Sequence, residues 1–309
     1  PGIVTTDIVG ADGYSATDYT NTFGGTSSAT PLVSGVIALM LEANPNLSYR
    51  DVMDILARTA EHNDPTDAGW TVNGAGLRVN HKYGFGAIDA RAAVTAALTH
   101  NSLGPLASRS TSIVRVNRTI PDSTPGGVVS SVTTNVQLNL EHVELVLNAS
   151  HQNRGDLAIT LISPSGTRSV MTQARTQDFG NDYTNWVFTT TRNWGERSDG
   201  TWTVEIADLL TGTTGSFNDF QLRFHGTELP LSLSITPGSV AENAGAGAAT
   251  GTVTRGGGVS LAQPLVVTLT SNDTSEATVP ATVTIPAGAA SVTFPIRAID
   301  DTLSDGTQR

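Results

Sequence analysis

The sequence predicts a multidomain chain in which an α/β part is followed by two all-β sandwich domains. Convincing helical periodicity is confined to residues 1–100, alternation with a period of two begins near residue 113, and a second set of alternating segments follows Leu229-Pro230. The length of 309 residues also fits two or three domains. We place the boundaries at residues 1–100, a polar linker at 101–112, and the two sandwiches at 113–228 and 229–309.

The three predicted helices all lie in the first part. Residues Ala29–Leu41 are apolar nearly all round, which predicts a buried helix with Pro31 in its first turn. A second helix begins at Ser48, where Asp51 three residues later completes a capping box. The third spans Asp89–Leu98.

The predicted strands of both sandwiches alternate between apolar and polar residues and are separated by Gly-, Pro- and Ser-containing turns. In the middle part they are Val136–Leu140, Leu157–Ile162 and Trp202–Ile206. In the last part they are Leu231–Ile235, Val266–Leu269, Ala281–Ile285 and Val292–Ile296. Strands of this length and spacing favour sandwiches.

Composition excludes several classes of protein. Asp and Glu total 28 against 17 Lys and Arg, a net charge of −11, which argues against nucleic-acid binding. The absence of Cys excludes disulfides, Cys-ligated zinc and thiol nucleophiles. The richest apolar stretch, Leu32–Leu41, is too short to cross a bilayer, so we predict no membrane-spanning segment. A charged fraction of only 15% with 31 Gly is typical of an extracellular β-rich protein.

The candidate chemistry lies in the segment Gly24–Pro31. A Gly-rich turn places Ser27 at the start of an apolar helix, where the positive helix end and free backbone N–H groups favour a developing oxyanion. A Ser before a helix is usually an N-cap, which is the alternative interpretation. The pattern Gly-Thr-Ser-x-Ala-x-Pro is longer than a cap requires, so Ser27 is our candidate nucleophile.

This segment resembles the subtilisin-like serine proteases, and the resemblance to their kexin/furin branch extends over Ile3–Asp7, Leu41–Val52 and Asn73–Ala90. It implies that residues 1–100 are the C-terminal part of the catalytic domain and that Ser27 is the nucleophile of a serine endopeptidase. The substrate would be a protein or peptide, cleaved after basic residues in this branch.

The chain departs from the family pattern around the rest of the catalytic machinery. The family triad runs Asp, His, Ser, yet none of the six His precedes Ser27. We therefore expect the triad Asp and His and the oxyanion Asn in sequence before Pro1, and we expect these 309 residues alone to be inactive. Phe23 also stands where furin-type members carry a His.

The middle part resembles the P domain, or Homo B domain, of proprotein convertases. The matching segments are Asn153–Ser169, Phe179–Phe188 and Gly200–Ile206. The resemblance implies a jelly-roll-like sandwich that packs on the protease domain. It also accounts for Arg154-Gly155-Asp156, so an integrin-binding role for this triplet is disfavoured.

The last part resembles an incomplete Calx-beta repeat, an Ig-like calcium-binding sandwich, at Val240–Asn243, Ser271–Asp273 and Ile299–Asp301. Calcium is the cofactor that both resemblances imply. Its candidate ligands here are Glu242, Asp273, Asp300 and Asp301, with Glu276 and Asp305 as secondary candidates. The alternative is that these are solvated turn residues.

Two other functions stay open beside the protease. One is a pseudoprotease that serves as a binding module, and the other is a surface protein that adheres through its β-modules. In each case we expect a secreted or cell-surface protein, and the lack of Cys favours a bacterial source over the disulfide-bearing eukaryotic convertases.

Overall fold

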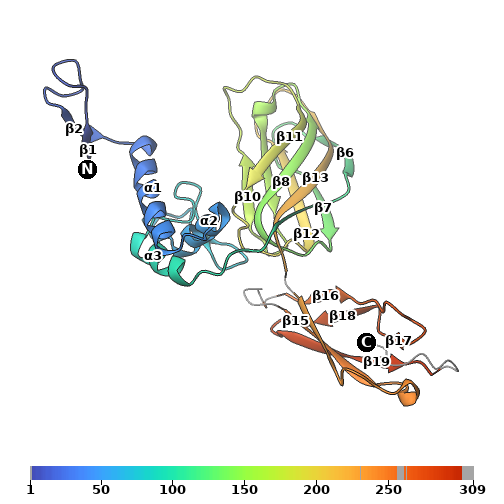
Figure 1. Ribbon diagram of the computed structural model, residues 1–309. Helices are drawn as coiled ribbons and strands as arrows, with labels where there is room; N and C mark the ends of the chain where they lie inside the picture. The colour runs from blue at the N-terminus through green and yellow to red at the C-terminus, as the bar shows by residue number, and fades with distance from the viewer. Residues whose placement is uncertain (1, 230, 256–260, 262, 301–309) are drawn as a thin grey trace. The chain divides into compact units, whose positions relative to one another are not determined.

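The computed structural model describes residues 2–229, 231–255, 261 and 263–300 (Figure 1). The chain divides into two compact units, Pro1–Gly104 and Pro105–Arg309. The second unit contains the middle and last parts predicted from the sequence.

The first unit combines three helices with two small hairpins (Figure 1). The strands β1 and β2 pair antiparallel, as do β3 and β4. In chain order the elements are β1 (Ile3–Thr6), β2 (Tyr19–Phe23), α1 (Thr26–Ala43), α2 (Tyr49–Thr59), β3 (Thr71–Val72), β4 (Arg78–Val79) and α3 (Ala90–Thr99).

Helices α2 and α3 begin where the sequence predicts. The Ser48 hydroxyl accepts from the Asp51 N–H and the Asp51 carboxylate accepts from the Ser48 N–H, so the capping box is complete. Asp89 caps α3 by accepting from the Ala92 N–H at 2.9 Å. Their apolar faces meet α1 in one small core, formed by Met40, Leu47, Val52, Ile55, Ala93 and Ala97.

Helix α1 differs from its prediction in two ways. It begins at Thr26, so Pro31 lies inside the helix instead of in its first turn. It is also mostly exposed, with Leu32 and Leu39 57% and 51% accessible, because only one face packs on the small core. The prediction of a buried helix is therefore wrong for this chain.

Helix α1 is longer than the predicted helix at both ends, and this changes the membrane prediction. At 18 residues, α1 is long and apolar enough to qualify as a candidate membrane span by length and composition. Core helices of soluble proteins pass the same test. No other helix of the described residues qualifies.

The middle part of the chain, at the start of the second unit, is a sandwich of two antiparallel sheets (Figure 1). One sheet has the order β10-β9-β12-β7, and the other has the order β11-β8-β13-β5, with β6 also pairing with β13. The strands are β5 (Leu106–Ser110), β6 (Val114–Ile120), β7 (Thr124–Thr134), β8 (Leu138–Ser150), β9 (Leu157–Ile162), β10 (Arg168–Thr172), β11 (Tyr183–Thr190), β12 (Gly200–Asp208) and β13 (Gly215–Glu228).

One continuous core fills the sandwich, with Trp202, Tyr183, Phe217, Phe220 and Phe224 as its largest side chains. Alternate residues of β12 are buried, as the period of two predicts. Strand β5 lies inside the segment assigned to a linker and pairs with β13. Its sequence, Leu-Ala-Ser-Arg-Ser, is too polar to show the alternation of a core strand.

The last part forms a four-stranded sheet, β14-β15-β19-β17, and a separate pair, β16-β18. Leu265, Ile285, Val253 and Phe294 are among the residues of its core. Its strands are β14 (Leu231–Thr236), β15 (Ala249–Arg255), β16 (Leu265–Thr268), β17 (Ala277–Thr278), β18 (Thr282–Ile285) and β19 (Ser291–Ala298). All four predicted strands are present, whereas the Calx-beta resemblance stays a prediction.

Candidate active site

The candidate nucleophile Ser27 is the second residue of α1 and is exposed. The N-cap of the helix is Gly25, so the interpretation of Ser27 as an N-cap is wrong. The neighbouring Ser28 is instead buried, and its hydroxyl donates to the Gly25 carbonyl at 2.9 Å. The Ser27 side chain makes no hydrogen bond within the described residues, which leaves its hydroxyl available.

Two backbone features leave the main chain of Ser27 outside the helical hydrogen-bond ladder. Its N–H belongs to the first turn, whose donors have no acceptor inside a helix. Its carbonyl would accept from residue 31, which is Pro31 and has no N–H. Gly25 starts the turn with φ 77° and ψ −169°, a conformation that is nearly restricted to glycine. The N–H of Ser27 therefore faces no competing helical acceptor.

No histidine activates Ser27 within the described part of the first unit. His62 packs edge-on against Trp70 with their ring centroids 4.7 Å apart, and His81 is exposed. His100 contacts Asp51, with Nε2 3.1 Å from Oδ1. A general base for Ser27 is therefore absent from these described residues.

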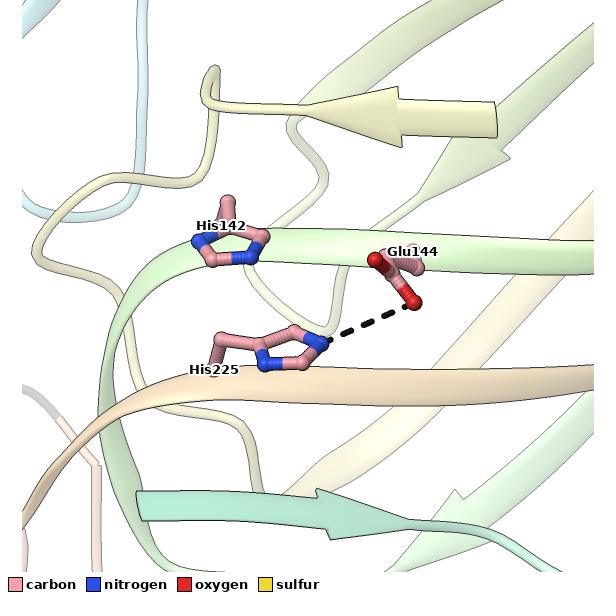
Figure 2. Close-up of side chains that lie close together, drawn as sticks. All are labelled: His142, Glu144 and His225. Atoms are coloured by element: carbon pink, nitrogen blue, oxygen red, sulfur yellow. Dashed lines mark ion pairs between the residues drawn. The ribbon is translucent and has the colours of Figure 1, made fainter. Parts of the chain in front are cut away.

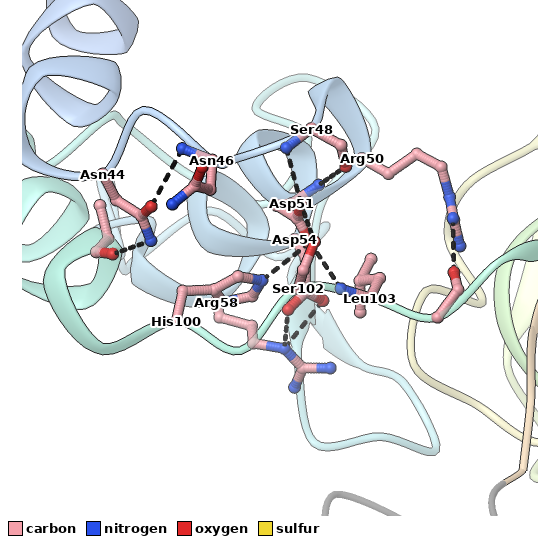
Figure 3. Close-up of polar contacts among 12 residues, drawn as sticks. Asn44, Asn46, Ser48, Arg50, Asp51, Asp54, Arg58, His100, Ser102 and Leu103 are labelled. Atoms are coloured by element: carbon pink, nitrogen blue, oxygen red, sulfur yellow. Dashed lines mark hydrogen bonds and ion pairs between the residues drawn. The ribbon is translucent and has the colours of Figure 1, made fainter.

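Asp51 joins α2 to the segment that follows α3 (Figure 3). Its fully buried carboxylate accepts from Ser102 Oγ, from the Leu103 N–H and from the Ser48 N–H, each at 2.7 Å. Burial alone would raise the pKa of Asp51, but these hydrogen bonds outweigh it and hold the pKa well below the ordinary value.

The set Asp51, His100 and Ser102 contains the residue types of a catalytic triad but not its connections. Ser102 donates to Asp51 instead of to His100, so the histidine is not placed to take its proton. The cluster is a structural anchor. The sequence revealed only its local part, the capping box.

The Arg154-Gly155-Asp156 triplet is part of the framework of the middle sandwich. The Arg154 guanidinium lies 4.9 Å from the ring centroid of Trp186 and 3.2 Å from the Asp178 carboxylate. Gly155 is buried, and a side chain there would overlap the carbonyl oxygens of Asp178 and Arg175. Arg154 and Gly155 are therefore occupied by internal contacts.

The candidate calcium ligands fall into three groups in the structure. Glu242 and Asp273 line one pocket of about 330 Å³ together with Glu276, one of the secondary candidates. Asp300 is exposed and is not among the residues that line this pocket. Asp301, like Asp305, lies outside the described residues.

Within the described residues, two sets of three side chains have donor atoms within 4.8 Å of one another and could hold a metal ion; both lie in the middle sandwich. One is His151, Asp156 and Asp208, and the other is His142, Glu144 and His225. Neither set is apparent from the sequence, because each depends on contacts between segments that are distant in the chain.

Two family profiles match this chain. Residues 2–86 match the subtilase family, and residues 140–224 match the proprotein convertase P-domain. Neither match reaches the part that begins at β14.

Curated relatives match this chain over most of its length. The chain is 38% identical over 245 residues to endoprotease bli-4 of Caenorhabditis elegans, which covers 74% of the chain and 25% of that protein. It is 36% identical over 244 residues to furin of Mus musculus, covering 77% of the chain and 30% of furin. The chain therefore spans about a quarter to a third of these two proteins.

Solved structures agree with the sequence matches. The serine protease of Aeromonas sobria, in its complex with the chaperone ORF2, superposes with a TM-score of 0.66 at 26% identity, over 73% of this chain and 51% of the protease. The same protease solved by itself gives a TM-score of 0.65 at 28% identity.

Proposed function

We propose that the chain is part of a kexin-like serine endopeptidase with Ser27 as its nucleophile, on the premise that residues 2–86 match the subtilase family and residues 140–224 match the proprotein convertase P-domain. The observation that carries the proposal is the position of Ser27. It is exposed on the first turn of α1, two residues after the N-cap Gly25, whose conformation other residues rarely adopt.

In the proposed reaction, Ser27 Oγ attacks the carbonyl carbon of a peptide bond while a histidine of the whole protein takes its proton. The oxyanion that forms accepts from the Ser27 N–H, which has no helical acceptor. Collapse of this intermediate breaks the C–N bond, and the histidine returns the proton to the leaving amine. An acyl-enzyme remains on Oγ, and water then hydrolyses it.

The proposal is tested by labelling the full-length protein with a fluorophosphonate probe, which reacts with activated serine hydroxyls. We expect labelling of the wild type and none of Ser27→Ala. Ser28→Ala is the matched control, because Ser28 is the adjacent residue but its hydroxyl donates to Gly25. It should be labelled at least in part.

An unlabelled wild type with its triad Asp and His present and any propeptide removed would contradict the proposal. That result would instead favour a pseudoprotease, or a surface protein that adheres through its β-modules.

For the substrate, we propose proteins or peptides cut after basic residues. The support is the similarity to endoproteases and proprotein convertases. A peptide set that differs only in the residue before the scissile bond tests this, since equal cleavage after Arg and Ala would contradict it.

We also propose that calcium stabilises the last part of the chain. The support is the pocket shared by Glu242, Asp273 and Glu276, which offers the oxygen ligands that calcium prefers. Asp300 and Asp301 stay candidates without a structural argument. A calcium-dependent rise in melting temperature of the full chain, lost in Glu242→Gln and Asp273→Asn but kept in Glu42→Gln on α1, is the expected result. An identical rise in all variants would contradict it.

We propose a secreted or cell-surface location because of the similarity to these proteases, and the bacterial source stays a prediction. We propose that the apolar face of α1 is a core face in the whole protease domain, not a membrane span. Packing of the P domain on that domain is part of the same proposal.

A further inference from the structure

Two histidines and a glutamate lie together on one sheet of the P domain (Figure 2). His142 and Glu144 belong to β8 and His225 to β13, and His225 is paired directly with His142 in the antiparallel register. Residues two apart on a strand share a face, so His142 and Glu144 point to the same side. Their neighbours Val143 and Leu145 are in the core, which places the three polar side chains on the outer face.

The donor atoms converge. The imidazole rings stack with centroids 4.2 Å apart and an interplanar angle of 4°. His225 Nε2 lies 3.7 Å from Glu144 Oε2, and the donor atoms of all three residues lie within 4.8 Å of one another. Figure 2 shows one nitrogen of each ring on the side of Glu144. Two ligands of a tetrahedral zinc ion are about 3.4 Å apart, so only small side-chain movements are needed.

Ser108 on the neighbouring strand β5 fixes the orientation of His225. Its Oγ lies 2.9 Å from His225 Nδ1. His225 Nε2 is buried and has no hydrogen-bond partner within the described residues. If Nδ1–H donates to Ser108, the lone pair of Nε2 is free and faces Glu144. An outer hydrogen bond of this kind is what orients histidines that bind metals.

All three side chains are partly buried. The side chains of His225 and Glu144 are 18% and 23% exposed, whereas Nε2 of His225 is covered, so an ion reaches this nitrogen only after a side-chain movement.

We propose that His142, Glu144 and His225 form a binding site for a divalent transition metal of the zinc class. Two imidazole nitrogens and one carboxylate oxygen are a typical zinc donor set, and they favour zinc over calcium or magnesium, which take oxygen ligands. The fourth position is left to water. The site lies in the P domain and does not depend on the proposed protease activity.

The competing contact is an ion pair. Arg223 on β13 places Nη1 3.4 Å from Glu144 Oε2, and its side chain is 43% exposed. An exposed pair of this length contributes little, so a metal that binds Glu144 displaces Arg223 at small cost. Arg223→Gln should therefore leave zinc affinity unchanged or raise it.

The test is isothermal titration of the full chain with zinc chloride. We expect one zinc per chain at this site in the wild type, and binding at least about tenfold weaker in His142→Gln, His225→Gln and Glu144→Gln. Ser108→Ala should weaken binding by about 10-fold through its effect on His225. The control is His81→Gln, an exposed histidine of the first unit, which should bind as the wild type does.

Cobalt(II) provides a second measurement, because its visible absorption reports coordination by imidazole. The bands should appear in the wild type and be lost in His142→Gln. Far-UV circular dichroism checks that each variant is folded, and Glu144→Gln tests the site with both histidines kept in place. Absence of zinc binding in the wild type overturns the proposal. So does zinc binding that is unchanged in all three ligand variants, since the metal would then lie elsewhere, for instance at His151 and Asp208.

Discussion

Replacing the buried Asp51 should destabilise the first unit far more than the loss of a helix cap does. Asp51 accepts hydrogen bonds from the Ser48 N–H, Ser102 Oγ and the Leu103 N–H, and it contacts His100. Asp89 also stabilises a helix start, but its side chain accepts from a single N–H. The pair Asp51→Ala and Asp89→Ala therefore separates capping from the contacts that Asp51 makes across about fifty residues of chain.

The expected magnitude follows from the number of partners. Loss of a cap costs about 1 kcal/mol, which is the whole effect expected of Asp89→Ala. Each hydrogen bond to a charged group contributes about 1.5–3 kcal/mol, and such contributions are not fully additive within one network. We expect Asp51→Ala to lower the free energy of unfolding of the first unit by about 4 kcal/mol.

Hydrogen exchange measured by mass spectrometry reports each unit separately. A loss of about 4 kcal/mol corresponds to roughly 1,000-fold faster exchange of the Leu103 amide and of α2. Exchange in β8 and β12 of the second unit is the internal reference and should not change. Equal acceleration of α2 and α3 exchange in the two variants would refute the reasoning, because Asp51 would then act only as a cap.

The pH dependence gives a second check on Asp51. Its folded-state pKa is lowered from 3.8, so its stabilisation is present above that pH and is lost as the pH falls toward the folded-state value. The difference between the wild type and Asp51→Ala should therefore narrow below about pH 4.

Three further predictions rest on single contacts. Gly25→Ala should cost about 1–3 kcal/mol and slow fluorophosphonate labelling, because alanine is strained at φ 77° and the turn that presents Ser27 must shift. Lys82→Met should raise the pKa of Asp67 from about 2 toward 3.8 in an NMR titration, since the hydrogen bond from Lys82 is the largest cause of the lowered pKa. In the wild type the Asp67 carboxylate becomes protonated only as the pH falls through about 2. Asp208→Ala should destabilise the middle sandwich by about 3–5 kcal/mol in denaturant unfolding, because it removes the partner of Nε2 of the buried His151, which lies 3.0 Å from the Asp208 carboxylate.

Each of these predictions has a control or a contradicting result. Gly24→Ala lies next to Gly25 but outside the positive-φ region, and it should label faster than Gly25→Ala. An Asp67 pKa that stays near 2 without Lys82 would assign the lowering to Asn80 and the Gly69 N–H instead. If Asp208→Ala unfolds with the same denaturant midpoint as the wild type, then Nε2 of His151 finds another partner.

The parts of the fold that depend on neighbouring residues were predictable from the sequence. The caps at Ser48 and Asp89 are fixed within three residues of chain, and strands β9 and β12 show their buried faces as simple alternation. The sequence predicts a start for α1 at Ala29, three residues after the observed start at Thr26, because Pro usually lies in the first turn of a helix. Here the helix extends back to Gly25, whose glycine-restricted conformation begins it.

The candidate site was predictable only where its chemistry lies in one short segment. Ser27 stands in a seven-residue motif, whereas the His142–His225 pair exists only because β8 and β13 meet in one register. The same limit applies to Asp51, whose partners Ser102 and Leu103 are about fifty residues away. The calcium candidates show the same limit. Glu242 and Asp273 line one pocket and Asp300 does not, but the spacing of the three residues in the sequence does not reveal this difference.

The open face of α1 has a practical consequence for handling these 309 residues. Leu32, Leu39 and Leu41 are all more than a third exposed in the folded chain, and such a surface promotes self-association and adsorption at concentrations used for spectroscopy. This surface should also bind hydrophobic dyes before any heating. Dye-based melting curves would then start at high fluorescence, and the fluorescence increase on unfolding would be small. Substituting Leu32 and Leu39 by Glu or Lys, on a face that this chain does not pack, should yield a more soluble reagent in which both units keep their folds.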